Sequence, residues 1–261
     1  MSSRNAAFQQ WQALLTNRAK RQRAGEFLVQ GVRPVTLAVE HGWTVRTLLR
    51  PPGEVSRWAR DLLAAVDAEQ VEVAPELLAE LADKDSAELV AVVALPPDRL
   101  DRIPLDLVVV FDRPATPGNI GTLVRSADAF GASGLVVTGH AADPYDPRAV
   151  RASTGSLFAL PVVRVPSHRE VLDWAAGAQV VGTDEDGTVD VAEHDLTGPT
   201  LLLVGNETAG LSAAWRDAAG TTVRIPISGA ASSLNAAAAG TVVLYEAARQ
   251  RRAAGPRTAR P

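Results

Sequence analysis

The sequence predicts an α/β protein of two domains, and three observations support this class. Patterns typical of strands and helices alternate along most of the chain. In the C-terminal half the strands are continuous apolar runs, as expected for parallel strands that are buried on both faces. Between the two series, residues 95–104 (LPPDRLDRIP) contain three prolines and four charged residues, a composition that favours a linker. We therefore expect a small domain over residues 1–98 and a larger one over residues 105–252.

The first series begins with a strand at 25–31 (GEFLVQG), which has a glycine at each end. Apolar residues at strand spacing or in short runs predict the other strands, at 44–49, 70–73 and 89–94. Helical periodicity predicts helices at 34–41, 56–68 and 75–82, the last with a proline in its first turn. These elements are expected to form one compact α/β unit.

The second series is longer and predicts a parallel sheet covered by helices on both faces. Its strands are expected at 107–111, 134–138, 160–165, 179–183, 201–204 and 222–227. Its helices are expected at 120–130, 148–153, 168–176 and 234–252, and Gly131 would end the first of them. Residues 253–261 are predicted to be a disordered tail.

Composition excludes several classes of function. The chain has no cysteine, which removes disulfide frameworks, cysteine-ligated zinc and thiolate nucleophiles. The four histidines have no ligand spacing, so no metal site is expected. No apolar run reaches the ~18 residues that a bilayer span needs, and the first 15 residues lack the apolar core of a secretion signal. We expect a cytoplasmic protein with no membrane role.

Charge is distributed unevenly, although the net charge is only −4. Residues 1–33 contain six basic residues against one acidic residue, and residues 249–261 add five arginines. Basic ends on an acidic body are typical of segments that bind phosphate. The residues Arg18, Lys20, Arg21 and Arg23 are therefore candidate RNA contacts, and the alternative is a solvated helix face.

The chemistry is expected at the carboxyl ends of the parallel strands, where open α/β sheets bind ligands. Three loops there are rich in glycine, asparagine, serine or glutamate: 112–121 (DRPATPGNIG), 205–212 (GNETAGLS) and 228–235 (SGAASSLN). The glycine fingerprints of dinucleotide and NTP sites, the zincin HExxH and the hydrolase GxSxG motifs do not occur. A nucleotide-dependent oxidoreductase is therefore disfavoured.

These loops resemble the three motifs of the SpoU or TrmH branch of the SPOUT RNA 2′-O-methyltransferases. The matching segments are, in order, 117–132 (PGNIGTLVRSADAFGA), 201–212 (LLLVGNETAGLS) and 225–247 (IPISGAASSLNAAAAGTVVLYEA), with 151–162 (RASTGSLFALPV) between the first two. Residues 23–42 (RAGEFLVQGVRPVTLAVEHG) are similar to the L30e-like substrate-binding domain of many members. Two departures are Thr208, where a glycine is usual, and Ala236–Ala237, where valine and serine are common.

The resemblance implies a C-terminal trefoil knot, a homodimer and S-adenosyl-L-methionine as the methyl donor. The family's positions for catalysis correspond to Asn119, Arg125, Glu207, Ser233 and Asn235. We interpret Arg125 as a clamp on phosphate and on the developing oxyanion, because a guanidinium rarely releases its proton. Each residue also has a structural alternative.

The structural alternatives follow from local sequence. Asn119 would be an N-cap, Arg125 a surface arginine with a buried stem, and Glu207 a cap on the turn that follows it. Either Ser232 or Ser233 could cap the last helix.

The resemblance also implies a cofactor site, with aliphatic side chains around the adenine and glycine where the backbone approaches closely. The candidate cofactor contacts are Leu203, Val204, Gly205, Asn206, Ile225, Ile227, Ser233 and Leu234. As an alternative, the aliphatic members of this set are ordinary strand and helix core.

Within the family, the chain most resembles members that methylate a uridine ribose of 23S rRNA and give resistance to a ribosome-targeting antibiotic. A tRNA substrate is the alternative within the class. From another class, the chain could be a catalytically silent RNA-binding or ribosome-binding module. Binding of S-adenosylmethionine would distinguish the enzyme from the silent module.

Overall fold

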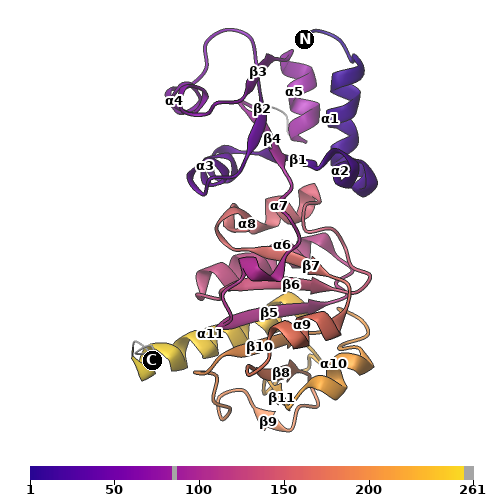
Figure 1. Cartoon of the computed structure of the whole chain (residues 1–261), viewed down its shortest axis with the longest axis vertical. Helices are drawn as coiled ribbons and strands as arrows, with labels where there is room; N and C mark the ends of the chain where they lie inside the picture. The colour runs from indigo at the N-terminus through magenta and orange to yellow at the C-terminus, as the bar shows by residue number, and fades with distance from the viewer. Residues whose placement is uncertain (84–86, 256–261) are drawn as a thin grey trace. The chain divides into compact units, whose positions relative to one another are not determined.

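The computed structural model describes residues 1–83 and 87–255 (Figure 1). The chain packs as two units, each with its own sheet. Unit 1 contains residues 1–97 together with residues 143–159, and unit 2 contains residues 98–142 together with the chain from residue 160 onward. Of the predicted tail, residues 256–261 lie outside the described residues.

Unit 1 has a four-stranded sheet in the order β1-β4-β2-β3. Its strands are β1 (Glu26–Gln30), β2 (Val45–Arg50), β3 (Glu69–Glu72) and β4 (Val90–Ala94). Strand β4 is antiparallel to β1 and β2, whereas β2 and β3 are parallel. The sequence analysis predicted these four strands, and each lies within a few residues of the expected position.

Helices cover both faces of this sheet. Helices α1 (Ala6–Thr16) and α5 (Pro75–Ala82) pack with Leu28 and Leu49 in one hydrophobic core. Helix α3 (Val32–Glu40) packs against β1 and α8 (Ser156–Ala159). Helix α4 (Arg57–Ala65) is tied to α3 by a hydrogen bond from the Trp58 indole to Thr36.

Aromatic contacts explain why residues 143–159 belong to unit 1. The ring of Phe27 in β1 lies 4.9 Å from that of Tyr145 and 6.3 Å from that of Phe158. The Trp43 indole donates a hydrogen bond to the carbonyl of Phe158. Helix α7 (Pro147–Ser153), which was expected at 148–153, lies in the same segment.

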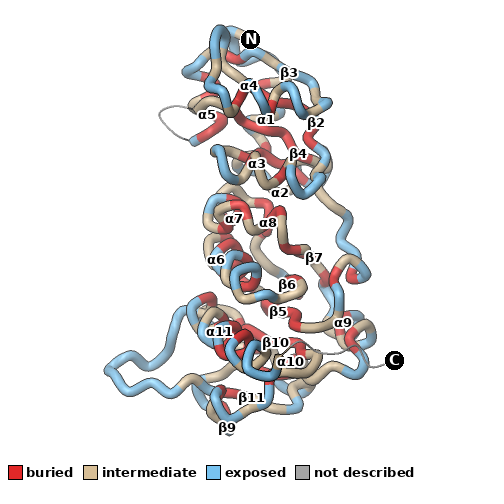
Figure 2. Tube along the Cα trace, turned by 90° about the vertical axis from the view of Figure 1, so that its left-hand side faces the viewer, coloured by how far each residue is buried: buried red, intermediate tan, exposed pale blue. Residues whose placement is uncertain are grey.

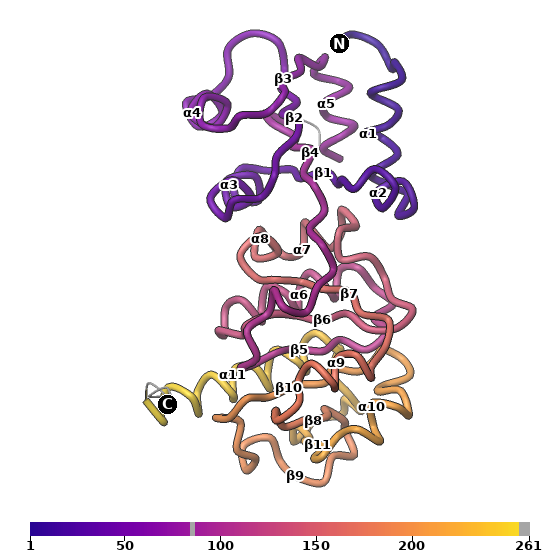
Figure 3. Tube along the Cα trace, in the orientation of Figure 1, coloured from indigo at the N-terminus to yellow at the C-terminus, as the bar shows by residue number. Residues whose placement is uncertain are grey.

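Unit 2 is a seven-stranded sheet in which every strand pair is parallel, as predicted. The strand order is β7-β6-β5-β10-β8-β11-β9. Strands β5 and β10 are neighbours at its centre, although Figure 3 shows by their colours that they come from distant parts of the chain. The bounds are β5 (Leu107–Asp112), β6 (Gly134–Thr138), β7 (Val162–Val165), β8 (Gln179–Thr183), β9 (Val189–Asp190), β10 (Thr200–Val204) and β11 (Thr221–Arg224).

Helices lie on both faces of this sheet too. On one face α9 (His168–Trp174) and α10 (Ala213–Ala218) bury Val171 and Trp215 against the strands. On the other face α6 (Pro117–Ala129) packs along α11 (Ala236–Ala254). This approach needs Gly240, because a Cβ there would lie 2.7 Å from a methyl carbon of Leu123.

The remaining elements are short or were not predicted. Helices α1, α2 (Arg18–Ala24), α8 and α10 had no prediction, and neither did strand β9 or the 3-10 turn at Leu100–Arg102. Residues 225–227, expected in the last strand, follow its end, and residues 226–235 are all exposed. This segment forms a pale blue loop between β11 and α11 (Figure 2). Among the described residues, no helix combines the length and apolar character that a membrane crossing requires.

Candidate active site

The three polar loops of unit 2 leave strands β5, β10 and β11 at their carboxyl ends. Because these strands are parallel, their carboxyl ends lie at the same edge of the sheet. The loops therefore meet there, together with the first turns of α6 and α11. Side chains from all three loops make direct contacts.

Glu207 connects the loop after β10 to the start of α6. Its carboxylate accepts hydrogen bonds from the backbone N–H groups of Ala115 and Thr116, at 2.8 and 3.0 Å. It also accepts one from Asn119 Nδ2 at 2.9 Å. The acceptor thus lies at a helix N-terminus, where unpaired N–H groups and the helix dipole stabilise negative charge. The alternative that Glu207 caps only its own turn is wrong.

The pKa of the Glu207 carboxyl reports the same environment. Burial acts to raise this pKa, but hydrogen bonds from Ala115, Asn119 and Thr116 outweigh it and hold the pKa below its ordinary value. The group is therefore a carboxylate at neutral pH. It is suited to orienting neighbouring donors and unsuited to acting as a general acid.

Asn119 and Asn235 complete a chain of side chains across the three loops. Asn235 Nδ2 donates to Asn119 Oδ1 at 3.2 Å, while Asn235 Oδ1 accepts from the N–H groups of Ala237 and Ala238. Asn235 is thus the N-cap of α11, so the expectation that Ser232 or Ser233 would cap this helix is wrong. Helix α6 begins at Pro117 with Thr116 as its N-cap, so the N-cap interpretation of Asn119 is also wrong.

A second set of contacts connects the loops after β5 and β10. Asn206 Nδ2 donates to the carbonyl of Arg113 at 2.7 Å, and the Arg113 guanidinium donates to the carbonyl of Gly210 at 3.1 Å. Asp112 accepts hydrogen bonds from Arg113 and from the N–H of Ser212. The sequence analysis did not identify Asp112 or Arg113. The sequence signal that could have identified Asp112 is an acidic residue directly after the apolar run of the predicted strand.

Gly205 has a structural reason for being glycine. Residues 206 and 210 exchange two backbone hydrogen bonds of 3.0 Å, which close the loop on itself. A Cβ on Gly205 would lie 2.5 Å from the carbonyl carbon of Gly210. Any larger residue at Gly205 would therefore open the loop that carries Glu207.

A cavity of about 210 Å³ is lined by residues 183–185 at the end of β8, by the loop after β10 and by the segment from β11 to the first turn of α11. Seven of the eight predicted cofactor residues line it: Val204, Gly205, Asn206, Ile225, Ile227, Ser233 and Leu234. Ile227 and Leu234 are 38% and 40% exposed, so apolar side chains stand uncovered beside the opening. The predicted catalytic residue Glu207 lines the cavity as well.

Leu203 does not line this cavity. Its side chain is fully buried in the core that contains Trp215 and Leu211, on the sheet face that α10 covers. Side chains alternate between the two faces of a strand, so Leu203 and Val204 point in opposite directions. The prediction of a Leu203 side-chain contact with the cofactor is wrong for this reason.

Arg125 lies apart from the hydrogen-bonded side chains of Glu207, Asn119 and Asn235. It is six residues beyond Asn119, which places it on a different side of α6. The side chain is exposed, and within residues 1–83 and 87–255 it has no hydrogen bond or ion pair. One copy of the chain therefore leaves this guanidinium available to a ligand or to another molecule.

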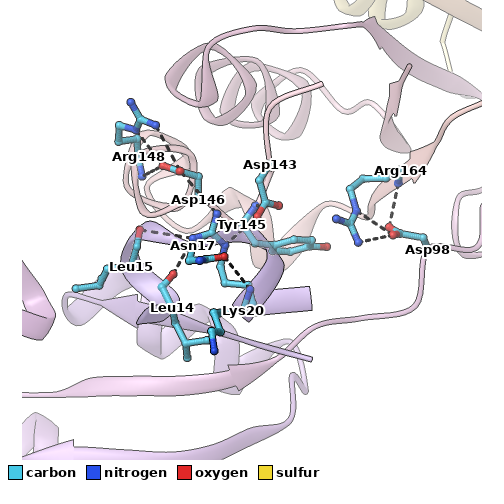
Figure 4. A network of polar contacts seen from close by, with 11 residues as sticks. Leu14, Leu15, Asn17, Lys20, Asp98, Asp143, Tyr145, Asp146, Arg148 and Arg164 are labelled. Carbon is cyan, nitrogen blue, oxygen red and sulfur yellow. Dashed lines mark hydrogen bonds and ion pairs between the residues drawn. The ribbon is translucent and has the colours of Figure 1, made fainter. Parts of the chain in front are cut away.

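The basic cluster of unit 1 divides into different environments. Arg21 is 2% exposed and donates to Asp143 Oδ2 at 2.8 Å and to the carbonyl of Leu14 at 2.7 Å. Figure 4 shows Asp143, Asp146 and the Leu14 and Leu15 carbonyls gathered around this network. The prediction that Arg21 contacts RNA is wrong, because its donors are already used inside the unit.

Lys20 and Arg23 are exposed on the same helix, and Arg18 is half-buried. Lys20 and Arg23 line a groove of about 620 Å³ with Gln9, Gln10 and Trp11 of α1. No carboxylate pairs with either cation in the described part of the chain. The described residues also contain no cluster of histidine and acidic side chains suited to a metal ion.

Comparison with known proteins gives two family matches and several close relatives. The SpoU rRNA Methylase family model matches residues 106–245, and the SpoU L30e-like domain model matches residues 5–91. The 23S rRNA (uridine(2479)-2′-O)-methyltransferase of Streptomyces viridochromogenes is 63% identical over 264 residues, which cover 96% of this chain and 92% of the relative. The 23S rRNA (guanosine(2553)-2′-O)-methyltransferase RlmP of Bacillus subtilis is 29% identical, covering 94% of this chain and 96% of the relative.

Solved structures agree with these matches. The crystal structure of the SpoU methyltransferase AviRb from Streptomyces viridochromogenes, in complex with the cofactor AdoMet, has a TM-score of 0.91 and 62% identity. The similarity covers 95% of this chain and 99% of that one. An AdoMet-bound rRNA methyltransferase from Sinorhizobium meliloti has a TM-score of 0.87 and 33% identity, covering 95% of this chain and 97% of that one.

Proposed function

This chain belongs to the SpoU rRNA methylase family, and we propose that it methylates the ribose 2′-hydroxyl of a uridine in 23S rRNA, with S-adenosylmethionine as the methyl donor. The observation that carries this proposal is the set of hydrogen bonds among Glu207, Asn119 and Asn235, which joins three loops beside a cavity. Its support from relatives is a uridine 2′-O-methyltransferase that is 63% identical.

The lining of the cavity suits this cofactor chemically. Val204, Ile225, Ile227 and Leu234 offer apolar walls for an adenine ring, and the loop closed at Gly205 brings backbone groups close to it. When bound, S-adenosylmethionine supplies a methyl group on a positively charged sulfur. The carboxylate of Glu207 lies in the lining of the same cavity.

The protein's own contribution is mainly positioning and fixed charge, because methyl transfer needs the ribose oxygen aligned with the donor. The amide groups of Asn119 and Asn235 hold each other, and Glu207 fixes Asn119 from the other side. Ser233 lies in the cavity lining near the end of the same loop. These groups orient the ribose hydroxyl, and its proton leaves to solvent as the oxygen is methylated.

Arg125 acts in a homodimer, in which it reaches the active site of a second copy. Its guanidinium has no partner among the described residues of its own chain. On the neighbouring helix α11, Val242 and Tyr245 are 39% and 51% exposed, an apolar surface that a second copy would bury. Arg125 would then clamp a phosphate of the RNA and stabilise the developing oxyanion.

Unit 1 grips the RNA through the groove between α1 and α2. Lys20 and Arg23 supply charge for phosphates, and Trp11 supplies an aromatic ring in the same groove. Arg18 on the same helix remains a candidate, although it does not line the groove. Arg21 is removed from this set because its donors bind Asp143 and Leu14.

Three further features belong to this proposal. The C-terminal segment forms the trefoil knot of SPOUT enzymes, and the protein works in the cytoplasm, where ribosomes are assembled. Methylation of the uridine would protect the ribosome from an antibiotic that binds nearby. Each of these features depends on the family resemblance.

The test is to incubate the protein with tritiated S-adenosylmethionine and separate samples of 23S rRNA, assembled large subunits and total tRNA. Label confined to 23S rRNA, mapped to a uridine 2′-O-methyl group, is the expected result. Label confined to tRNA would overturn the rRNA substrate in favour of the alternative within the class. A chain that binds no cofactor in calorimetry, with or without RNA, would instead be the silent RNA-binding module.

A further inference from the structure

The cofactor cavity carries charge of one sign. Among its lining residues in the described part of the chain three are acidic, Asp184, Glu185 and Glu207, and none is basic. The loop from residue 225 to residue 235, which forms another wall, has no charged residue at all. The interior of the cavity is therefore negative, and it favours a cationic ligand over a neutral ligand of the same shape.

The loop of residues 184–187 holds Asp184 in a fixed place. The Asp184 N–H donates to the carbonyl of Val223 at 3.1 Å, and Asp184 Oδ1 accepts from the N–H of Asp186 at 3.0 Å. Gly187 lies so close to β11 that a Cβ would be 2.5 Å from the carbonyl carbon of Val223. Asp184 Oδ2 remains near Gly210, a cavity-lining residue on the opposite loop.

Within the described residues of one copy, the two arginines near this cavity do not neutralise it, because each is paired elsewhere. Arg113 contacts the carbonyl of Gly210 but forms its ion pair with Asp112, at 3.1 Å. Arg224 forms its ion pair with Asp190, at 2.6 Å. The pKa of Glu207 is lowered, so its negative charge is present at neutral pH.

We infer that Asp184 and Glu185 are specificity residues that distinguish the methyl donor from its spent form by charge. This inference rests on the proposed function. S-adenosylmethionine carries a net charge of about +1 at neutral pH, from its sulfonium and ammonium groups and its carboxylate. In methyl transfer the bond from sulfur to the methyl carbon breaks and its electron pair stays on sulfur. The ribose oxygen gains the methyl group, and the hydroxyl proton goes to solvent.

The spent cofactor, S-adenosylhomocysteine, is therefore neutral overall while the cavity stays negative. The donor is held more tightly than the product, so turnover itself weakens binding and favours exchange. Two carboxylates at about 10 Å from a unit charge, in surroundings of effective dielectric constant near 20, would change the affinity ratio by roughly two powers of ten in the absence of salt. Screening at physiological ionic strength, with a Debye length of about 8 Å, reduces this change to about tenfold.

Calorimetry on the full-length protein tests this inference with three ligands. These are S-adenosylmethionine, S-adenosylhomocysteine and sinefungin, an unreactive analogue that replaces the methyl sulfonium with a protonated amine. The Asp184→Asn, Glu185→Gln double variant should lose about tenfold in preference for the two cationic ligands over the neutral one. The single Glu185→Gln variant changes an exposed side chain and should show a smaller loss with the fold intact.

Asp186→Asn is the matched control, because Asp186 is exposed on the same loop but does not line the cavity. The preference of this variant for the two cationic ligands over the neutral one should equal that of the wild type within about twofold. Equal affinity of the wild type for all three ligands, or an unchanged preference in both the double and single variants, would overturn the inference. Failure of the wild type to bind any of the ligands would overturn the proposed function instead, so the two failures are distinguishable.

Discussion

Two arginines on helices of the two units have opposite surroundings. Arg21 on α2 of unit 1 is 2% exposed, pairs with Asp143 and also contacts a backbone carbonyl. Arg125 on α6 of unit 2 is exposed, and the described residues of its own chain offer it no polar partner. A buried guanidinium must have its donors satisfied inside the protein, whereas an exposed one without partners keeps them for another molecule.

Charge and helical position in the sequence therefore do not separate a structural arginine from a functional one. Arg21 stands among three other basic residues, Arg18, Lys20 and Arg23, and was predicted to act with them. What distinguishes it is Asp143, which lies 122 residues later in the chain.

Replacing Arg21 by alanine should lower the free energy of unfolding by about 3–5 kcal/mol, because it leaves the Asp143 carboxylate buried without its partner. Urea denaturation followed by circular dichroism measures the loss. Arg23→Ala is the control on the same helix, and its exposed side chain should change stability by less than about 0.5 kcal/mol. Similar stability of the two variants would place Arg21 with the surface residues.

Replacing Arg125 by alanine should lower activity and leave stability unchanged, in contrast to the replacement of Arg21. Single-turnover methylation should slow by roughly 10²–10³-fold, as when a preorganised donor to an oxyanion is removed, while the unfolding transition stays in place. Arg125→Lys should recover little, because an ammonium cannot form the paired hydrogen bonds of a guanidinium. Arg169→Ala changes an exposed arginine on α9 and serves as the control. Full activity in Arg125→Ala would remove this residue from the active site.

Replacing Glu207 by glutamine keeps the shape of the side chain and removes its charge. We expect a loss of about 1–3 kcal/mol in unfolding free energy, because three donors at the start of α6 lose their charged acceptor. The folded-state pKa is lowered, so the stabilisation from the carboxylate is fully present above the ordinary value and is lost as the pH falls through the folded pKa.

The stability difference between wild type and Glu207→Gln should therefore shrink as the pH falls below about 4.5. Unfolding curves of both proteins, from neutral pH down to the acid limit of folding, measure this difference. A difference that stays constant with pH would mean that the carboxylate is not stabilised by the donors of α6.

The smallest effect is expected from the exposed cations of unit 1. The Lys20→Ala, Arg23→Ala double variant should bind single-stranded rRNA fragments several-fold more weakly, and the slope of log affinity against log salt should decrease by about 1.4. An Arg57→Ala, Arg60→Ala double variant on α4 removes the same charge from exposed positions in the same unit. Equal loss in both double variants would indicate a general charge effect and no specific groove.

The sequence allowed the fold of unit 2 and the meeting of its loops to be predicted, because parallel strands place their carboxyl ends at one edge. Seven of the eight cofactor residues line the cavity for the same reason. The exception, Leu203, differs from Val204 by a single position, and only the observed strand fixes which side chain faces which way.

Other features depended on partners distant in the chain. The cap of α11 is Asn235 because its side chain reaches Ala237 and Ala238 while also contacting Asn119, a residue 116 positions earlier. Arg113 and Asp112 had no motif to identify them, since their partners Asn206, Gly210 and Ser212 lie in another loop. Local sequence patterns contain no information on such pairs.

The last helix has a practical consequence for work with this protein. Asn235 begins α11 and Arg251, near its other end, donates hydrogen bonds to the carbonyls of Leu196 and Gly198 and to Asp106. The 19 residues of the helix span about 28 Å. The hydrogen bonds of Asn235 and Arg251 therefore fasten its two ends to different parts of unit 2. An affinity tag fused after Gly255 would leave these attachments intact. A truncation that removes Arg251 would break these three hydrogen bonds and leave Gln250, which contacts His194 and Leu196, as the attachment at this end.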